Sequence, residues 1–261
     1  MRTNLVKVRP AGQRAVLVAL LLAVAGAVVA PSPASASART PAQANFSANV
    51  YFPLVQGAVW KYNVVGGPEG GTNQTSTVVG GTKTAAGEQV QMKFKSSAKF
   101  QGKPLPAYIA DYLIEPDGVI KVASGSSGGL STTISGDVGS YMIPPASQIT
   151  HCGCSYSGKF TASAEGMSFQ GTLKETATSK GTVQVTVPAS SSPYTALQLD
   201  AVVNIKLSAA SMKVSATASY DFFLVKNVGL VKTSNASMKL TLFGSSTTSA
   251  VGNEILASYT P

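Results

Sequence analysis

The sequence predicts an all-β fold: a single antiparallel, strongly curved sheet or a partly closed barrel, with a two-sheet β-sandwich as the alternative. Two observations support this prediction. Apolar and polar residues alternate over long segments, which is typical of strands with one buried and one solvated face. Clusters of Gly, Pro, Asn and Ser interrupt these segments at short intervals, as expected of tight turns.

The alternating segments give the predicted strands in order. The series begins at 60–64, continues at 90–95 and includes two long segments, 195–207 and 212–225. The long segments suit strands that bend around a core, and small residues such as Ala216 permit that curvature. We expect about ten to twelve strands and almost no helix in the mature chain.

Turn chemistry is most specific between two apolar flanks at 115–118, where the sequence reads EPDG. Pro116 sets its own φ angle and Gly118 can take a positive φ, so this segment predicts a hairpin. The preceding segment, 105–113, fits helical spacing as well as a strand. The hairpin downstream favours the strand.

The N-terminus has the pattern of a secretory signal peptide. Four basic residues within 1–14 precede sixteen residues without charge, and overlapping A-x-A patterns follow. The uncharged run is short of the roughly 20 residues that span a bilayer. We expect cleavage after Ala38, a disordered leader over 39–49 and a single all-β domain over 50–261. The mature protein is then secreted or held in the extracytoplasmic cell envelope, with no transmembrane span.

The charge balance bears on the possible partners. Removal of residues 1–38 takes away four of the 20 basic residues and none of the 11 acidic ones, which leaves a net charge of +5. Arg39 is then the only arginine, whereas phosphate and base-edge recognition favour arginine, so we predict no nucleic-acid partner. A lysine cluster could attract an acidic cell-wall polymer, or could simply keep a strand face solvated. Its members are Lys93, Lys95, Lys99 and Lys103.

Two stretches resemble a known family. The segments YFPLVQGAVWKYNV (51–64) and YDFFLVKNVGLVK (220–232) are similar to those of TapB-like exported bacterial proteins, a group of poorly characterised β-rich domains. The resemblance implies a secreted or envelope β domain, in which Trp60 fills the core and Gly229 closes a hairpin. The matched residues are Tyr51, Phe52, Pro53, Leu54, Gly57, Trp60, Tyr62, Val187, Pro188, Ala189, Tyr194, Thr195, Leu197, Val228, Gly229, Leu230 and Val231.

The segment THCGCSYSG (150–158) contains the only histidine and both cysteines. An oxidising compartment, an even cysteine count and the Cys-Gly-Cys spacing favour a disulfide between Cys152 and Cys154. Together with His151, the two thiolates could instead bind copper(I) or zinc, although the sequence offers no fourth ligand. A redox-active dithiol, an intermolecular bond and free thiols are the further alternatives.

No catalytic residue and no cofactor are predicted. A catalytic Ser-His-Asp set would have to use His151, which lies beside the predicted disulfide, and Asp117 in the turn beside Glu115 has a sufficient structural role. We therefore predict a non-enzymatic binding or structural module.

The predicted module could hold a hydrophobic small molecule or a cell-envelope partner on an inner face that includes Phe94, Tyr220, Phe222 and Leu224. The same side chains could instead only fill the core. A metal-binding or thiol-redox protein that uses the His-Cys-Gly-Cys segment is the alternative function.

Overall fold

The computed structural model describes residues 44–67, 70–85, 87–100, 103–116, 118–127, 130–136, 143–164, 167–209, 212–242 and 244–261. The predicted signal peptide, its cleavage position and the first part of the leader lie outside these residues. The elements are β1 (Val59–Val65), β2 (Asn73–Thr84), β3 (Gly87–Ser96), β4 (Lys99–Phe100), β5 (Lys103–Pro104), β6 (Tyr108–Ile114), β7 (Ile120–Ser127), β8 (Leu130–Gly136), α2 (Ala146–Ile149), β9 (Gly153–Ala164), β10 (Met167–Val185), β11 (Tyr194–Ala209), β12 (Met212–Val225), β13 (Gly229–Leu242), β14 (Ser245–Ala250) and β15 (Asn253–Thr260).

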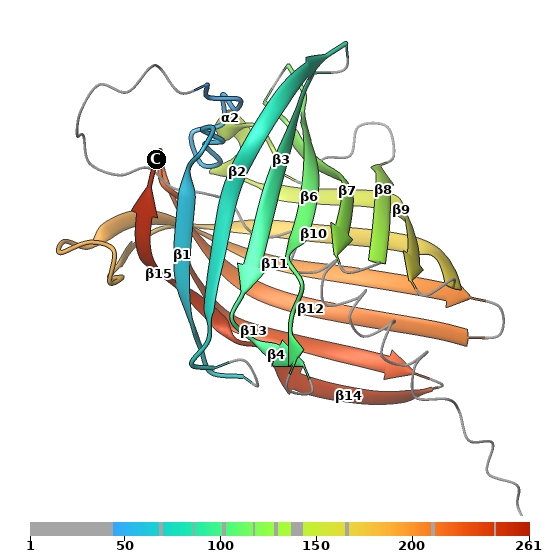
Figure 1. Ribbon diagram of the computed structural model, residues 1–261. Coiled ribbons are helices and arrows are strands. Elements are labelled where there is room, and N and C mark those ends of the chain that lie inside the picture. The colour runs from blue at the N-terminus through green and yellow to red at the C-terminus, as the bar shows by residue number, and fades with distance from the viewer. Residues whose placement is uncertain are drawn as a thin grey trace, which may run out of the picture.

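Twelve of these strands form a closed antiparallel barrel (Figure 1). The hydrogen-bonded order is β12-β11-β10-β9-β8-β7-β6-β3-β2-β1-β15-β13, and β13 pairs back to β12. This pairing closes the ring, so the barrel prediction is confirmed and the two-sheet sandwich is not what forms. β14 extends the sheet outside the ring as a hairpin with β13, and β4 and β5 form a separate small hairpin.

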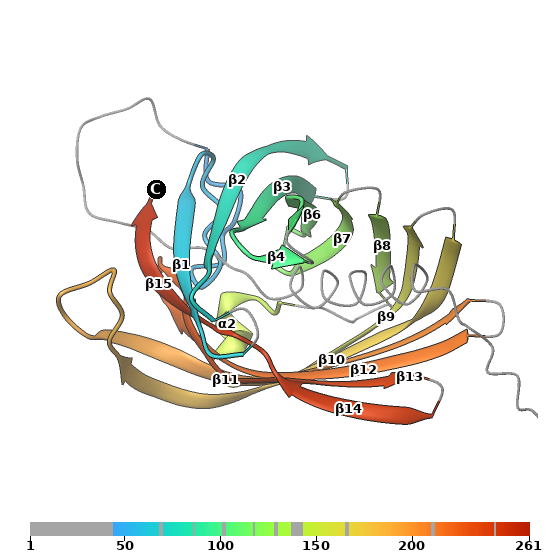
Figure 2. The same cartoon turned by 60° about the horizontal axis from the view of Figure 1, so that its bottom comes forward.

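The barrel has two walls when it is seen along the view of Figure 2. One wall contains β15, β1, β2, β3, β6, β7 and β8, and the other contains β9 to β13. Strands in the second wall are long, with 19 residues in β10 and 16 in β11. Their length and strong twist allow them to curve around the core.

Alternation along the strands separates the inside of the barrel from the outside. On β1, Trp60, Tyr62 and Val64 are buried while Lys61 and Asn63 are exposed. The pattern continues through β11 and β12, where the buried residues of one strand lie opposite those of the next. The interior therefore forms one continuous apolar cluster.

The ring closes at a seam between β13 and β15, where one residue pair, Lys232 and Ile255, is in ladder register. Side chains supply further bonds at the seam. The Glu254 backbone N–H donates to Thr233 Oγ1 at 2.8 Å, and the Ala236 N–H donates to Asn253 Oδ1 at 3.2 Å. The seam thus depends on side-chain acceptors as well as on the backbone ladder.

A bulge in β13 lies where that strand changes its neighbour on the edge away from β12. The β12–β13 register shifts beside Asp221, and Asn235 has a φ of 52° there. The Asp221 carboxylate accepts hydrogen bonds from Ser234 Oγ and from Asn235 Nδ2. Beyond the bulge, β13 pairs with β14, while its first half reaches β15. Bulges bend a strand in this way wherever an extra residue is inserted.

The segment before β1 packs against one end of the barrel. Asn49 donates from its side chain to the Pro144 carbonyl at 2.8 Å, and the Asn227 N–H donates to the Val50 carbonyl at 2.6 Å. Asn45 and Val55 form an isolated bridge within the segment. Residues 44–49 belong to the predicted leader, and within them and just after them the Asn49 and Tyr51 N–H groups donate to the side-chain oxygens of Ser47 and Asn49.

Two tyrosine rings lie over glycines of neighbouring strands. A Cβ at Gly125 would overlap the Tyr108 ring, and a Cβ at Gly136 or Gly158 would overlap the Tyr156 ring. Both tyrosines are buried. Because glycine has no side chain, the two tyrosine rings can lie along the inner wall at these positions.

Most local predictions are confirmed among the described residues. Segment 105–113 contributes to strand β6, and the Glu115 N–H to Val119 carbonyl bond closes the predicted hairpin, with Gly118 at a φ of 86°. The two long strands expected near 195–207 and 212–225 form as β11 and β12. The described strands outnumber the expected ten to twelve because β4, β5 and β14 lie outside the ring.

Replacement of Gly158 by Ala is expected to destabilise the protein by roughly 1–3 kcal/mol, because the new methyl group would meet Tyr156 and the Ser135 carbonyl. Urea unfolding measures the change. Gly153→Ala is the matched control, since nothing lies within 4 Å of a Cβ there and its backbone is unstrained. Equal midpoints for the two variants would contradict this account of the glycines.

Candidate functional site

The cysteine segment begins where α2 ends. The Cys152 thiol is buried and its sulfur lies 3.7 Å from the Ala177 carbonyl oxygen, which places it against strand β10. The Cα atoms of Cys152 and Cys154 are 5.0 Å apart, within the separation that a disulfide needs. The two sulfurs form a close pair, and the disulfide itself stays a prediction.

His151 does not join the two sulfurs at a common site. Its side chain is exposed, and its Nδ1 lies 2.9 Å from the Thr150 hydroxyl. Within the described residues, no three His, Cys, Asp or Glu side chains are grouped closely enough to hold a metal ion. In the part of the chain that the structure describes, no third metal-ligating side chain therefore lies beside the two cysteines.

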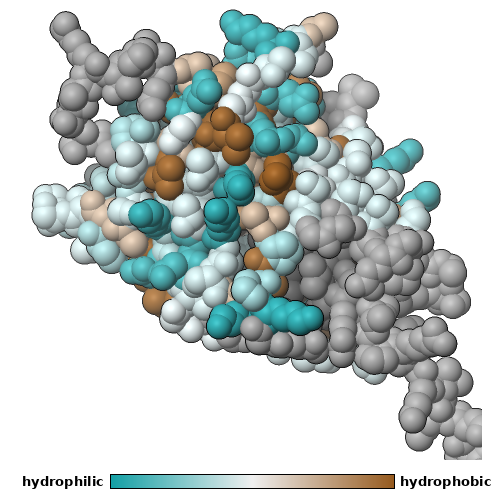
Figure 3. Space-filling view, in the orientation of Figure 1, coloured by the Kyte–Doolittle hydropathy of each residue, from teal (hydrophilic) through white to brown (hydrophobic). Residues whose placement is uncertain are grey.

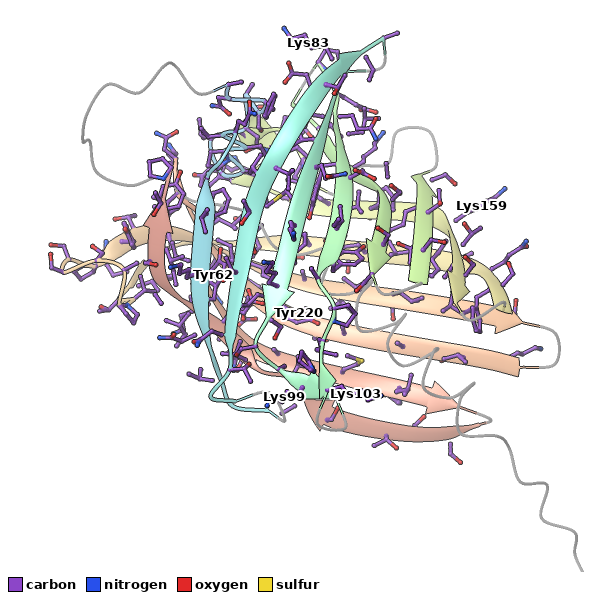
Figure 4. The ribbon with its side chains drawn as sticks, in the orientation of Figure 1. Tyr62, Lys83, Lys99, Lys103, Lys159 and Tyr220 are labelled. Atoms are coloured by element: carbon purple, nitrogen blue, oxygen red, sulfur yellow. A yellow bond between two sulfur atoms is a disulfide. The ribbon has the colours of Figure 1, made fainter. Side chains whose placement is uncertain are left out.

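The lysine cluster lies on the outer surface. Lys93 and Lys95 project from the outward positions of β3, and Lys99 and Lys103 belong to the β4–β5 hairpin (Figure 4). On the face shown in Figure 3, hydrophobic residues lie in small separate areas among hydrophilic ones. Binding of an acidic polymer by these lysines remains a prediction.

The inner face is the most distinctive chemical surface of the barrel. Phe94, Phe222 and Leu224 are buried there, as the sequence predicts for an apolar inner face. Tyr220 is half-buried and stacks on Phe222 with ring centroids 5.5 Å apart. Figure 4 labels Tyr62 on β1 and Tyr220 on β12, which belong to opposite walls.

In the described strands of the barrel, no lysine, arginine or histidine side chain is buried in the interior, and Lys83, opposite Glu88 at the end of β2, is 88% exposed. Lys159, Lys174 and Lys206 occupy outward positions beside buried neighbours, and the other strand lysines follow the same alternation or lie on exposed strand ends. The groups that carry inward charge are carboxyls. One of them, Glu254, lies opposite Val64 on β1, and its charge adds to burial in raising the pKa of Tyr62.

Glu175 is a buried carboxyl among apolar residues of the second wall. It lies opposite Tyr156 on β9 and Val203 on β11, and its Oε2 atom has no hydrogen-bond partner. Burial disfavours the charged form and raises the pKa of Glu175 to about 8. At neutral pH this side chain is therefore largely protonated and can donate a hydrogen bond.

Three more unpartnered polar atoms lie in a single row across the other wall. Trp60 on β1 lies directly opposite Ser76 on β2 and Tyr259 on β15. The Trp60 Nε1, Ser76 Oγ and Tyr259 hydroxyl atoms are all buried and have no partner. We call these three residues the polar row.

Sequence reasoning placed Trp60 in the core but missed the polar row and Glu175. A signal for Glu175 exists, because it follows Leu173 at a distance of two residues and thus shares its buried face. For the row no such signal exists. Tyr259 lies far along the chain from Trp60 and Ser76, and only the closure of the barrel brings the three together.

Within the described residues, no helix has the length and apolar character needed to cross a membrane.

Titration of the unfolded, non-reduced protein is expected to find no free thiol, because Cys152 and Cys154 are close enough to be bridged. The same titration after reduction gives two thiols per chain as its control. Two thiols before reduction would refute the disulfide.

Stability is expected to fall as the pH rises from about 5 to 8, at up to about 1.4 kcal/mol per pH unit, because the folded state keeps a proton on Glu175 that the unfolded state releases. Glu175→Gln removes this dependence, whereas Glu88→Gln, at the end of β3 where the carboxylate is paired with Lys83 at 3.8 Å, retains it. Urea unfolding at pH 5, 6.5 and 8 measures the slopes. Identical slopes in the wild type and Glu175→Gln would show that burial does not perturb this carboxyl.

No protein-family model matches this chain, and no curated protein matches it. Among solved structures, the chain is similar to a candidate lipoprotein of Parabacteroides distasonis, with 13% identity, a TM-score of 0.48, and 81% of this chain and 99% of that chain covered. It is also similar to a candidate exported protein with a YmcC-like fold from Bacteroides fragilis, with 12% identity, a TM-score of 0.44, and 84% and 100% coverage. The resemblance to TapB-like proteins stays a prediction.

Proposed function

We propose that this protein is a non-enzymatic, extracytoplasmic β-barrel module that holds a hydrophobic ligand inside its barrel. The single observation that carries the proposal is a closed ring of twelve strands with an apolar inner face. The predicted signal peptide supports the compartment. The apolar side chains of the interior support a hydrophobic ligand.

Strand number is the first support. In a barrel of about eight strands, side chains fill the interior or leave room for one small ligand, and the diameter grows roughly linearly with the number of strands. Twelve strands thus form a wider ring than the strands of a small barrel do. An apolar ligand is a natural occupant of the interior of such a ring.

The sizes and directions of the inner side chains are the second support. Tyr108 and Tyr156 lie along the wall over glycines instead of filling space across the barrel. On β11 and β12, Ala201, Ala216 and Ala218 are buried at inward positions. Small side chains at these positions take up little of the volume next to the second wall.

The position of the single histidine favours a binding module over a hydrolase. His151 is exposed beside α2, so the interior has no imidazole to activate a nucleophile. The buried carboxyl Glu175 has Val203 and Tyr156 as its direct cross-strand neighbours. A protonated carboxyl in such surroundings acts as a hydrogen-bond donor and not as a base at neutral pH.

Binding of the neutral fluorophore N-phenyl-1-naphthylamine to the full chain is expected to be saturable. Ala218→Phe is expected to abolish the binding, because the added ring would take the place of a ligand beside the second wall, where Ala218 faces inward. Fluorescence titration measures the binding, and urea unfolding measures the stability.

Thr217→Phe is the control, since Thr217 faces outward on the same strand and this change leaves the interior as it is. If the wild type binds no probe and Ala218→Phe is destabilised by roughly 1–3 kcal/mol, the interior is fully packed and the proposal is wrong.

A further inference from the structure

The outer face of the second wall carries lysines among uncharged polar side chains. One row of outward residues crosses the sheet from β9 to β14, because each member lies directly opposite the next in the strand register. The row consists of Lys159, Thr172, Lys206, Ser215, Thr241 and Ser246. Both lysines of the row are exposed, and Figure 4 shows Lys159 projecting away from β9.

A second row has the same composition and lies two residues along each strand from the first. It consists of Ser157, Lys174, Asn204, Thr217, Lys239 and Thr248. On the other side of the first row, Lys213 lies opposite Ser208, which lies opposite Gln170. We call the two rows, together with Lys213, Ser208 and Gln170, the basic face.

The basic face has charges of one sign. Its lysines are exposed, and none of them forms an ion pair with a described residue. On the described strands β9 to β14 the outward carboxylates are Asp200 and Asp221, which lie two rows beyond Lys174. Asp200 is paired with Lys180 at 2.8 Å, and Asp221 accepts hydrogen bonds from side chains of the β13 bulge. Because the lysines of the face have no balancing acid, they attract a polyanion.

The spacing of the lysines selects among polyanions. Neighbouring strands lie about 4.8 Å apart, so Lys159 and Lys206, on strands two apart, are separated by about 10 Å. Lys174 and Lys239 are on strands three apart and are separated by about 14 Å. Double-stranded DNA has one negative charge per about 1.7 Å of its axis, which is far denser. The face therefore matches a polymer whose charges lie at wide intervals.

The side chains between the lysines indicate what lies between those charges. Thr172 separates Lys159 from Lys206 across the row, and two further polar residues separate the lysines of the second row. Hydroxyl and amide groups both donate and accept hydrogen bonds, as the hydroxyls of sugars do. The two rows contain no large apolar side chain, whereas segments that lie on a bilayer insert an apolar face. These features favour a polysaccharide over a lipid surface.

We propose that the basic face binds an acidic polysaccharide in which carboxylated sugars alternate with uncharged ones. The lysines pair with the carboxylates, and the Ser, Thr, Asn and Gln side chains between them bind the hydroxyls of the intervening sugars. The predicted export of the protein brings this face into contact with extracellular polymers. The face lies outside the barrel, so this inference does not depend on the ligand proposed for the interior.

The test uses a hyaluronate hexasaccharide, in which every second sugar carries a carboxylate, and the full-length protein. Binding is expected at about 0.05 M NaCl and is expected to weaken strongly at about 0.5 M, because the Debye length then falls below the spacing of the lysines. The uncharged chitin hexasaccharide has the same length and is expected not to bind. Isothermal titration calorimetry measures both sugars.

A triple variant locates the binding site. Lys159→Gln, Lys206→Gln and Lys239→Gln together are expected to weaken hyaluronate about three- to hundredfold, because each exposed ion pair contributes little by itself. All three side chains are exposed, so urea unfolding is expected to give the wild-type midpoint.

The matched control removes the same charge from the first wall. Lys93→Gln, Lys95→Gln and Lys99→Gln together change β3 and β4, outside the basic face, and are expected to leave hyaluronate binding as it is. An equal loss of affinity in the two triple variants would show that net charge alone attracts the sugar, and the inference would be wrong.

Two further results would also overturn the inference. Tighter binding of duplex DNA or of phosphatidylglycerol vesicles at the same salt concentration would identify a different partner. No binding of hyaluronate at low salt would mean that the lysines only keep the wall solvated. Neither result bears on the proposed function, because the N-phenyl-1-naphthylamine titration tests the interior separately.

Discussion

Closure of the sheet is the constraint on which the rest of this structure depends. A sheet that ends in free edges exposes unpaired backbone groups, and a ring removes most of them. Here the first strand pairs with the last, since Val59 lies opposite Thr260, and the ring is completed at the β13–β15 seam. Only one residue pair is in ladder register at the seam, so the side-chain oxygens of Thr233 and Asn253 accept hydrogen bonds from backbone N–H groups there.

The bulge at Asp221 and Asn235 lies where β13 changes its neighbour at this closure. β13 pairs with β12 along its whole length, and on its other edge it meets β15 in its first half and β14 in its second half. The carboxylate of Asp221 fixes the bend by accepting from two side chains of the bulged segment. A local polar contact on the outer surface thus lies at the point where β13 passes from β15 to β14.

Local features of this fold could be predicted from the sequence, whereas features made by closure could not. The alternation at Trp60 and Tyr62 and the turn at Gly118 depend on neighbours within a few residues, and both were predicted correctly. Alternation states which face a residue occupies, but not which strand lies beside it. The pairing of Trp60 with Tyr259 spans nearly the whole domain, so the polar row could not be inferred before the ring was known.

The same alternation also explains why the two faces of the barrel have such different chemistry. The lysines of the described residues lie on the outer face, at strand ends or in loops, as in the pair of Lys180 with Asp200 at 2.8 Å. Water screens those charges, so they affect the interior only weakly. Inside, a single buried carboxyl such as Glu175 has its pKa raised to about 8, because no solvent or cation stabilises its charge. A one-residue shift in strand register would exchange these two environments, and the bulges and glycine–tyrosine contacts that fix the register therefore also fix the chemistry of the interior.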